Sequence, residues 1–250
     1  MTRELRQLCN LIQELAEKIR KDVSRRAPNS AQQVVILFMF AKAYKSFRAA
    51  LILFREGFWQ DAVSLGRTIL ELMFQAMWLS RDSESAATLF LRGEERERRK
   101  LLNNLSRHGA QEIRGKVDLL SRELSKTGDI DLAWHNWWSK GGNIEQLARE
   151  SGPAVERTYQ LKYRPMSWFI HSSPFSIKYF MPPEREEFAI EWSPAKPEKE
   201  DEAFAEMLFS AADEGLFNIM AVADTIYALE RRPDFERVAA ALMKFARKTD

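Results

Sequence analysis

The feature that most constrains the fold is the helical spacing of hydrophobic residues along nearly the whole chain. In the first segment Leu or Ile recurs every three or four residues, at Leu5, Leu8, Ile12, Leu15 and Ile19. Side chains with this spacing share one face of an α-helix and need a packing partner. Similar periods predict further helices near residues 31–56, 61–79, 83–107, 113–128, from 143, from 153, and near 200–229 and 234–248. We therefore expect an all-α fold, a single helical bundle of about seven to eight helices.

One region departs from this periodicity, residues 174–197, where the sequence is rich in proline. Proline lacks an amide hydrogen and interrupts a helix, so we expect an irregular excursion here. "EFAIEW" is the only plausible short strand within it. Because the chain shows no internal repeat and no low-complexity linker, we expect residues 1–250 to form one domain, with the helices of 200–248 packed on the rest.

The composition favours a soluble globular protein, with 45% hydrophobic and 30% charged residues and a net charge of +2. A single cysteine, Cys9, allows neither an internal disulfide nor a thiolate metal cage. The most apolar run, residues 34–54, is interrupted by Lys42, Lys45 and Arg48, and the N-terminus lacks the apolar centre of a signal peptide. We expect a cytoplasmic protein that does not span a membrane.

The stretch "YRPMSWFIHSSP" contains the first candidate site, formed by Arg164 and His171. Seven residues turn a helix by about 700°, so the two side chains would share a face. Such a pair suits cleavage of RNA without a metal, with the guanidinium holding a phosphate and the imidazole moving a proton. The alternative is structural: Pro165 predicts a kink in the helix, and a histidine at a helix C-terminus can stabilise it without any chemistry.

Arg67 and Glu71 form the second candidate constellation, one turn apart on a helix too apolar for a surface element. Buried charges must be paired, so we expect a contact between these two side chains or with other polar groups inside the bundle. Either they form a network that orients Tyr163, Ser167 or His171, or they only fix the register of the helices. No spacing such as H-E-x-x-H supports a metal site, and no nucleotide-binding motif occurs, so we expect no metal and no cofactor.

Two motifs resemble those of an uncharacterised bacterial family of helical proteins, a domain of unknown function. One is Tyr-x3-Tyr-x3-Ser-x3-His, here Tyr159, Tyr163, Ser167 and His171, preceded by "WWSKGGNIEQLA". The other is R-[ST]-I/L-x-E, here at residues 67–71. The resemblance covers about residues 30–175 and implies a helical fold without a known activity.

A looser similarity is to the HEPN superfamily, helical proteins found among bacterial toxins and phage-defence ribonucleases. Their mark is an arginine and a histidine separated by four to six residues, and Arg164 and His171 fit the upper limit, although Pro165 stands where HEPN proteins usually have a polar residue. This similarity implies a metal-independent endoribonuclease acting on RNA as a toxin or phage-defence effector, a homodimer, and a partner protein or antitoxin. The catalytic residues would be Arg164 and His171, supported or lined by Arg67, Glu71, Tyr159, Tyr163 and Ser167. The alternative is a non-catalytic helical interaction or ligand-sensing module.

Overall fold

The computed structural model describes residues 1–81, 86–91, 93, 143–170 and 202–249, and all regular structure in these ranges is helical. The all-α prediction is confirmed. The elements are α1 (Arg3–Val23), α2 (Ala31–Arg55), α3 (Trp59–Arg81), α6 (Ile144–Glu150), α7 (Pro153–Thr158), the π-helical turn η3 (Tyr159–Tyr163), α8 (Arg164–Ile170), α9 (Glu202–Tyr227) and α10 (Arg232–Thr249).

Parts of the prediction fall outside the described residues. Of the helix expected near 83–107, the described residues 86–91 and 93 are helical. The helix expected near 113–128, the irregular region 174–197 and its short strand "EFAIEW" lie outside the described ranges. The expectation that residues 1–250 form a single domain stays a prediction.

Short-range signals in the sequence set several helix ends. Ser30 and Asn143 cap α2 and α6, because their side-chain oxygens accept hydrogen bonds from the backbone N–H groups of Gln33 and Gln146. At the other end of α2, Gly57 follows the C-cap with φ of 91°, a left-handed conformation that glycine adopts without strain. These ends agree with the sequence prediction.

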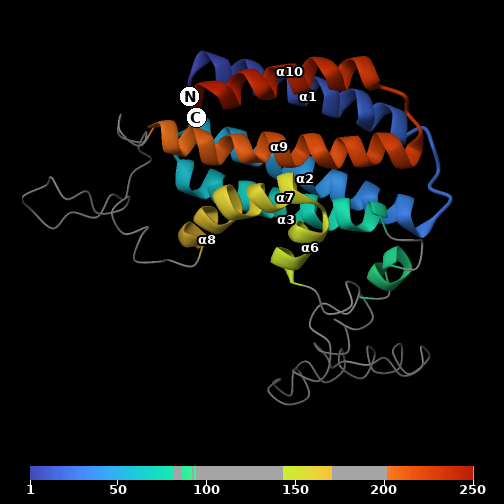
Figure 1. The fold of residues 1–250 in the computed structure, drawn as a ribbon. Helices are drawn as coiled ribbons and strands as arrows, with labels where there is room; N and C mark the ends of the chain where they lie inside the picture. The colour runs from blue at the N-terminus through green and yellow to red at the C-terminus, as the bar shows by residue number, and fades with distance from the viewer. Residues whose placement is uncertain (82–85, 92, 94–142, 171–201, 250) are drawn as a thin grey trace, which may run out of the picture.

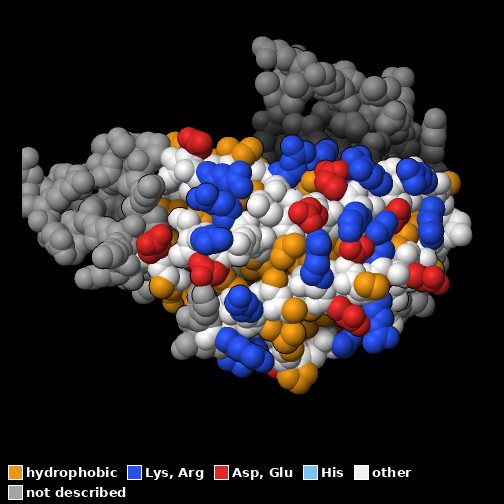
Figure 2. Space-filling view, turned by 90° about the horizontal axis from the view of Figure 1, so that it is seen from above, with side chains coloured by type: hydrophobic (Ala, Val, Ile, Leu, Met, Phe, Trp, Pro, Cys, Tyr) orange, Lys and Arg blue, Asp and Glu red, His pale blue; other side chains and the backbone are white. Residues whose placement is uncertain are grey.

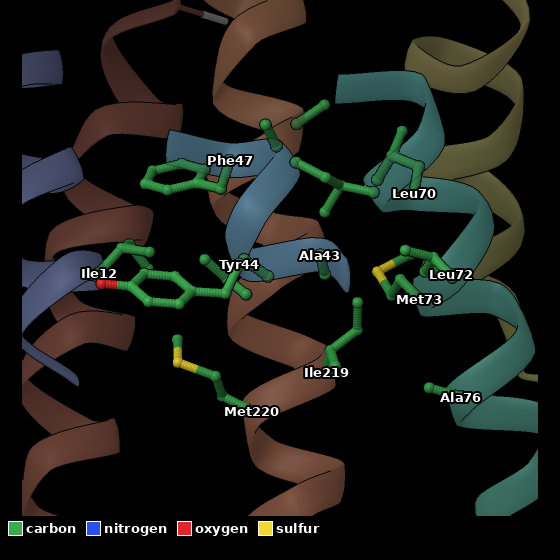
Figure 3. Packing of buried hydrophobic residues seen from close by; sticks show 14 of the residues in the cluster. Ile12, Ala43, Tyr44, Phe47, Leu70, Leu72, Met73, Ala76, Ile219 and Met220 are labelled. Carbon is green, nitrogen blue, oxygen red and sulfur yellow. The ribbon is translucent and has the colours of Figure 1, made fainter. Parts of the chain in front are cut away.

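Helix α9 lies at the centre of the bundle and packs against α1, α2, α3 and α10. Figure 1 shows α1 and α10 as one layer on one side of α9, with α3 and the short helices α6, α7 and α8 on the other side. Helix α3 is enclosed as expected: no residue from Ala62 to Leu79 is exposed. Figure 3 shows this core, where Leu70 and Met73 of α3 and Ile219 of α9 point toward one another.

One buried pair of side chains in this core is polar. Cys9 of α1 and Asp213 of α9 are both 0% exposed, and the Cys9 Sγ donates to Asp213 Oδ2 at 3.7 Å. The second oxygen, Oδ1, has no hydrogen-bond partner. Burial is the main cause that raises the pKa of both groups well above their ordinary values. The carboxyl group is thus enclosed and forms no ion pair with any residue in the described part of the chain.

A search of the described residues for a helix long and apolar enough to cross a membrane finds none.

Candidate functional site

The segment that carries the candidate site is one helical stretch, residues 153–170, which changes its winding in the middle. Gly152 has φ of 116°, and Pro153 occupies the first helical position, where a missing amide hydrogen costs nothing. From Tyr159 to Tyr163 the helix widens into a π-turn, which the N–H of Arg164 closes on the carbonyl of Tyr159. The stretch then returns to α-helix over residues 164–170.

Pro165 gives a physical reason for this π-turn. It has no N–H to donate, and its ring crowds the carbonyl one turn earlier in a regular α-helix. A π-turn just before the proline relieves that crowding, and such turns are a known cause of helix kinks. The distortion expected at Pro165 is therefore taken up before Arg164. The segment after it keeps α-helical geometry.

Arg67 is the hub of a polar network between α3 and this stretch. Its Nε donates to Ser167 Oγ at 2.9 Å, and its Nη1 lies 3.5 Å from Glu71 Oε2. The guanidinium carbon lies 4.5 Å from the centre of the Tyr163 ring, a cation–π distance. Three groups thus hold one side chain that is only 19% exposed.

Tyr163 is fixed by ring contacts and at its hydroxyl. Its ring stacks on Tyr159 at 5.1 Å and meets Phe74 edge-on, while its OH donates to Glu71 Oε2 at 3.4 Å. Burial, and next the negative charge of Glu71, raise the pKa of Tyr163, so its phenol stays neutral at physiological pH. Tyr163 is a hydrogen-bond donor here and a poor candidate for a general base.

Ser167 joins α8 to the same network. Its hydroxyl donates to the Tyr163 carbonyl at 3.0 Å, one turn earlier, and accepts the hydrogen bond from Arg67. The structure therefore brings together five residues singled out in the sequence: Arg67, Glu71, Tyr159, Tyr163 and Ser167. The contacts of Arg67 and Glu71 with Tyr163 and Ser167 are compatible with both roles considered, orientation of these side chains and fixing of the helix register.

The degree of enclosure differs between the two charged members. The Arg67 side chain is 19% exposed, whereas that of Glu71 is 36% exposed. Glu71 thus lies at the edge of α3, where solvent reaches it. Water screens this carboxylate, so the ion pair contributes less than a fully buried one would.

The proposed catalytic pair is described only in part. Arg164 is exposed at the start of α8, and its Nη1 donates to Gln160 Oε1 at 3.0 Å, one turn earlier. The guanidinium of Arg164 thus faces solvent, outside the Arg67 network. His171 lies outside the described residues, so its distance from Arg164 is not part of the structure.

Sequence reasoning missed the residues that tie the π-turn to α9. Glu214 of α9 accepts from Thr158 Oγ1 at 2.6 Å with one oxygen and from Lys162 Nζ at 2.6 Å with the other. The spacing of Thr158 and Lys162 places them on one helical face. Their shared partner is more than 50 residues later, and no local pattern points to it.

In the ranges that the structure describes, no group of three or more His, Cys, Asp or Glu side chains could hold a metal ion. The comparisons with known proteins give one match. The sequence profile of a family of unknown function, DUF5677, matches residues 33–188. No curated protein and no solved structure matches the chain.

Proposed function

The chain belongs to this family of unknown function, DUF5677, and we propose that it is a metal-independent endoribonuclease whose reacting groups are Arg164 and His171. The observation that supports this proposal best is the position of Arg164. It is an exposed cation at the start of a regular α-helical turn, and Ser167, three positions later on the same helix, is held in place by Arg67. A fixed helix with an exposed arginine can hold a phosphate in a defined position.

The chemistry assigned to the pair is cleavage of RNA by its own 2′-hydroxyl. The 2′-oxygen attacks the adjacent phosphorus, its proton passes to water, and the bond from phosphorus to the 5′-oxygen breaks. His171 would give a proton to the departing 5′-oxygen. Arg164 would hold the non-bridging oxygens in its planar fork and stabilise the charge that develops on them.

The remaining residues of the site support the pair without touching the phosphate. Ser167 lies on α8 between the two reacting residues in the sequence, and its bond to Arg67 fixes that helix against α3. Glu71 and Tyr163 hold the Arg67 guanidinium in turn. The similarity to HEPN proteins extends the proposal to a cytoplasmic toxin or phage-defence effector that works as a homodimer, controlled by a partner protein or antitoxin.

A second candidate function is a non-catalytic helical module that recognises a partner or a ligand. The observation in its favour is that Arg67 finds its partners inside the bundle. A guanidinium engaged in this way stabilises the packing of α8 on α3 and needs no substrate. In this case Arg164 would be an ordinary surface residue.

Expression of the wild type and of two variants in a bacterial host separates these functions. We expect the wild type to slow growth and degrade RNA, and His171→Ala to abolish both effects. Arg164→Lys should reduce RNA cleavage at least about tenfold, because an ammonium group lacks the bidentate fork. The purified wild type should cut RNA equally well with and without EDTA.

Arg157→Lys is the matched control, because Arg157 is another exposed arginine two helical turns before Arg164. It should retain wild-type cleavage. Melting temperatures of all purified variants should stay close to that of the wild type. If all variants affect growth and RNA as the wild type does, or if the wild type cuts no RNA, the ribonuclease proposal is wrong.

A further inference from the structure

We propose that the cleft between α1 and α2 binds an amphipathic anion, a small molecule with an apolar body and a phosphate, sulfonate or carboxylate head. The cleft arises from the packing of the bundle. Helix α1 packs on α9 and α10, whereas α2 packs on α3 and α9. Both helices therefore contact α9 and leave the cleft between them. None of the residues that line this cleft belongs to the Arg67 network or to the proposed ribonuclease site.

The Tyr44 side chain bridges the cleft and separates its two pockets. Its hydroxyl donates to Glu17 Oε1 on α1 at 2.5 Å, and burial with this contact raises the pKa of Tyr44 to about 12. On one side of the bridge lies a pocket of about 450 Å³, and on the other a more open hollow of about 800 Å³. The smaller pocket has the size of a small-molecule site.

Part of the wall of the smaller pocket is apolar. Val23 of α1 and Leu37, Phe40 and Ala41 of α2 line it, and the rings of Phe40 and Tyr44 stack at 6.2 Å. Val23 and Phe40 are already buried, so an aliphatic chain or a flat ring placed between the helices would cover mainly Leu37 and Ala41, and burial of its own apolar surface favours its binding.

The charged groups around the cleft select the head group. Lys45 and Arg48 line the smaller pocket and Lys21 lines the larger hollow, and none of the three forms an ion pair with any residue that the structure describes. The guanidinium of Arg48 lies 5.9 Å from the centre of the Tyr44 ring, which holds it over the cleft. These three cations are available to an incoming anion.

The other charged residues of the cleft are already engaged. Glu17 is bound by Tyr44 and Arg20, Lys18 by Asp234, and Glu14 by Arg237. These carboxylates are thus paired, whereas Lys21, Lys45 and Arg48 form no ion pair with a described residue, so the residues lining the cleft carry an excess of positive charge. Figure 2, which looks onto the molecule from the α1 and α10 side, shows Lys and Arg side chains spread over this face with hydrophobic side chains exposed between them.

Calorimetric titration with two synthetic probes tests the proposal on the full-length chain. Decyl phosphate carries an aliphatic body and 1-naphthyl phosphate a flat one, so the two distinguish a lipid-like from an aromatic ligand. We expect at least one of them to bind with a stoichiometry of one and at least about tenfold more tightly than inorganic phosphate, because the apolar body adds buried surface. Binding should weaken as salt concentration rises.

Two variants of α2 locate the site. Lys45→Gln combined with Arg48→Gln should weaken binding of the probe at least about tenfold, and Ala41→Trp should fill the pocket and block it. Lys42→Gln is the matched control, because Lys42 is exposed on the same helix and does not line the cleft. It should bind like the wild type. Melting temperatures should show that every variant is folded, since all three lysine and arginine positions are exposed.

Several outcomes would overturn the inference. The inference is wrong if the wild type and the double variant bind the probe with equal affinity, or if the organic phosphates bind no more tightly than inorganic phosphate. It is also wrong if the cleft binds an acidic helical peptide that neither probe displaces. RNA cleavage measured on the same variants keeps the two proposals separate, because the cleft variants leave Arg164 and His171 unchanged.

Discussion

At the scale of single residues, Asp213 is the group whose environment departs most from that of a free side chain. It is completely buried, its Oδ1 accepts no hydrogen bond from the described residues, and its Oδ2 accepts one from the weak donor Cys9. Burial raises its pKa well above the ordinary value of 3.8, so the folded chain keeps a proton that the unfolded chain loses. Ionisation of the unfolded chain therefore lowers the stability of the fold as pH rises from about 4.

Asp213→Asn removes this ionisable group, and we expect it to change how stability depends on pH. Near pH 3 the Asp213 side chain of the wild type is neutral in the folded and in the unfolded chain, so the stabilities of the two proteins should differ only by the contacts of the new amide. Between pH 4 and 7 the variant should gain stability relative to the wild type, because only the wild type loses free energy to ionisation of its unfolded chain.

Urea unfolding at several pH values measures this difference. Asp61→Asn serves as a control, because Asp61 is an exposed carboxylate on α3, and its effect should vary much less over this range. A stability difference between Asp213→Asn and the wild type that is the same at pH 4 and at pH 7 would contradict the assigned protonation of Asp213.

At the scale of helices, two glycines permit the close approach of neighbouring elements, and they differ in what surrounds them. A Cβ at Gly215 of α9 would lie 2.9 Å from Ile69 Cγ2 and 3.3 Å from Leu70 Cδ2, both in the core. A Cβ at Gly66 of α3 would lie 3.2 Å from Met166 Cε, the free end of a flexible side chain. The contact of α3 with α9 is therefore tight, whereas that of α3 with α8 can adjust.

We expect Gly215→Ala to lower the free energy of unfolding by about 1–3 kcal/mol, since the β-branched Ile69 cannot move away easily. Gly66→Ala should be close to neutral, because the better helix propensity of alanine, about 1 kcal/mol, offsets the displacement of Met166. Denaturant unfolding of the two variants makes the comparison. A larger loss for Gly66→Ala than for Gly215→Ala would mean that the packing of α3 is assigned wrongly.

At the scale of the whole molecule, Arg231 joins the end of α1 to the start of α10. Its Nε donates to Asp22 at the end of α1 at 2.5 Å, and its Nη1 to Asp234 of α10 at 3.0 Å. Lys18 of α1 binds the same Asp234 at 2.5 Å. The hydrogen bond from Arg231 is the main cause that lowers the pKa of Asp22, and the bond from Lys18 is the main cause for Asp234.

A carboxyl group whose pKa is lowered by folding stabilises the folded chain at pH values above its ordinary pKa of 3.8. This stabilisation is lost as the pH falls through the pKa of the group in the folded chain. We expect Arg231→Met to destabilise the fold by about 1 kcal/mol at pH 7, and to have a smaller effect as pH falls toward 2, because protonation removes the carboxylate charge that Arg231 pairs with.

Thermal unfolding at the two pH values checks this. Arg232→Met is the control, because the Arg232 side chain is 88% exposed and pairs only with Glu236 on its own helix. It should melt like the wild type at both values. An equal loss for Arg231→Met at pH 7 and pH 2 would assign the role of Arg231 to packing instead of charge.

Much of the fold follows from local patterns in the sequence. The period of the hydrophobic residues predicted the helices, and the end expected near residue 56 and the starts expected at 143 and 153 agree with the structure. Helix periodicity also placed Arg67 and Glu71 on one face of α3, and Tyr163 and Ser167 on one face of the stretch 153–170. These results are available from sequence because backbone hydrogen bonds and side-chain spacing within a helix depend on residues a few positions apart.

Only the tertiary structure decided which faces meet. Arg67 and Ser167 are 100 positions apart, and Cys9 and Asp213 are 204 apart, so no local period relates them. The bridge of Tyr44 to Glu17 likewise depends on a neighbour from another helix. The position of the π-turn before Pro165 depends on how the backbone strain at the proline is distributed along its helix. The helices and their apolar faces thus follow from the sequence alone. The Arg67 network, the buried carboxyl group and the cleft follow from how these faces pack on α9. Packing decides this because many faces are compatible, and shape and enclosed charge select among them.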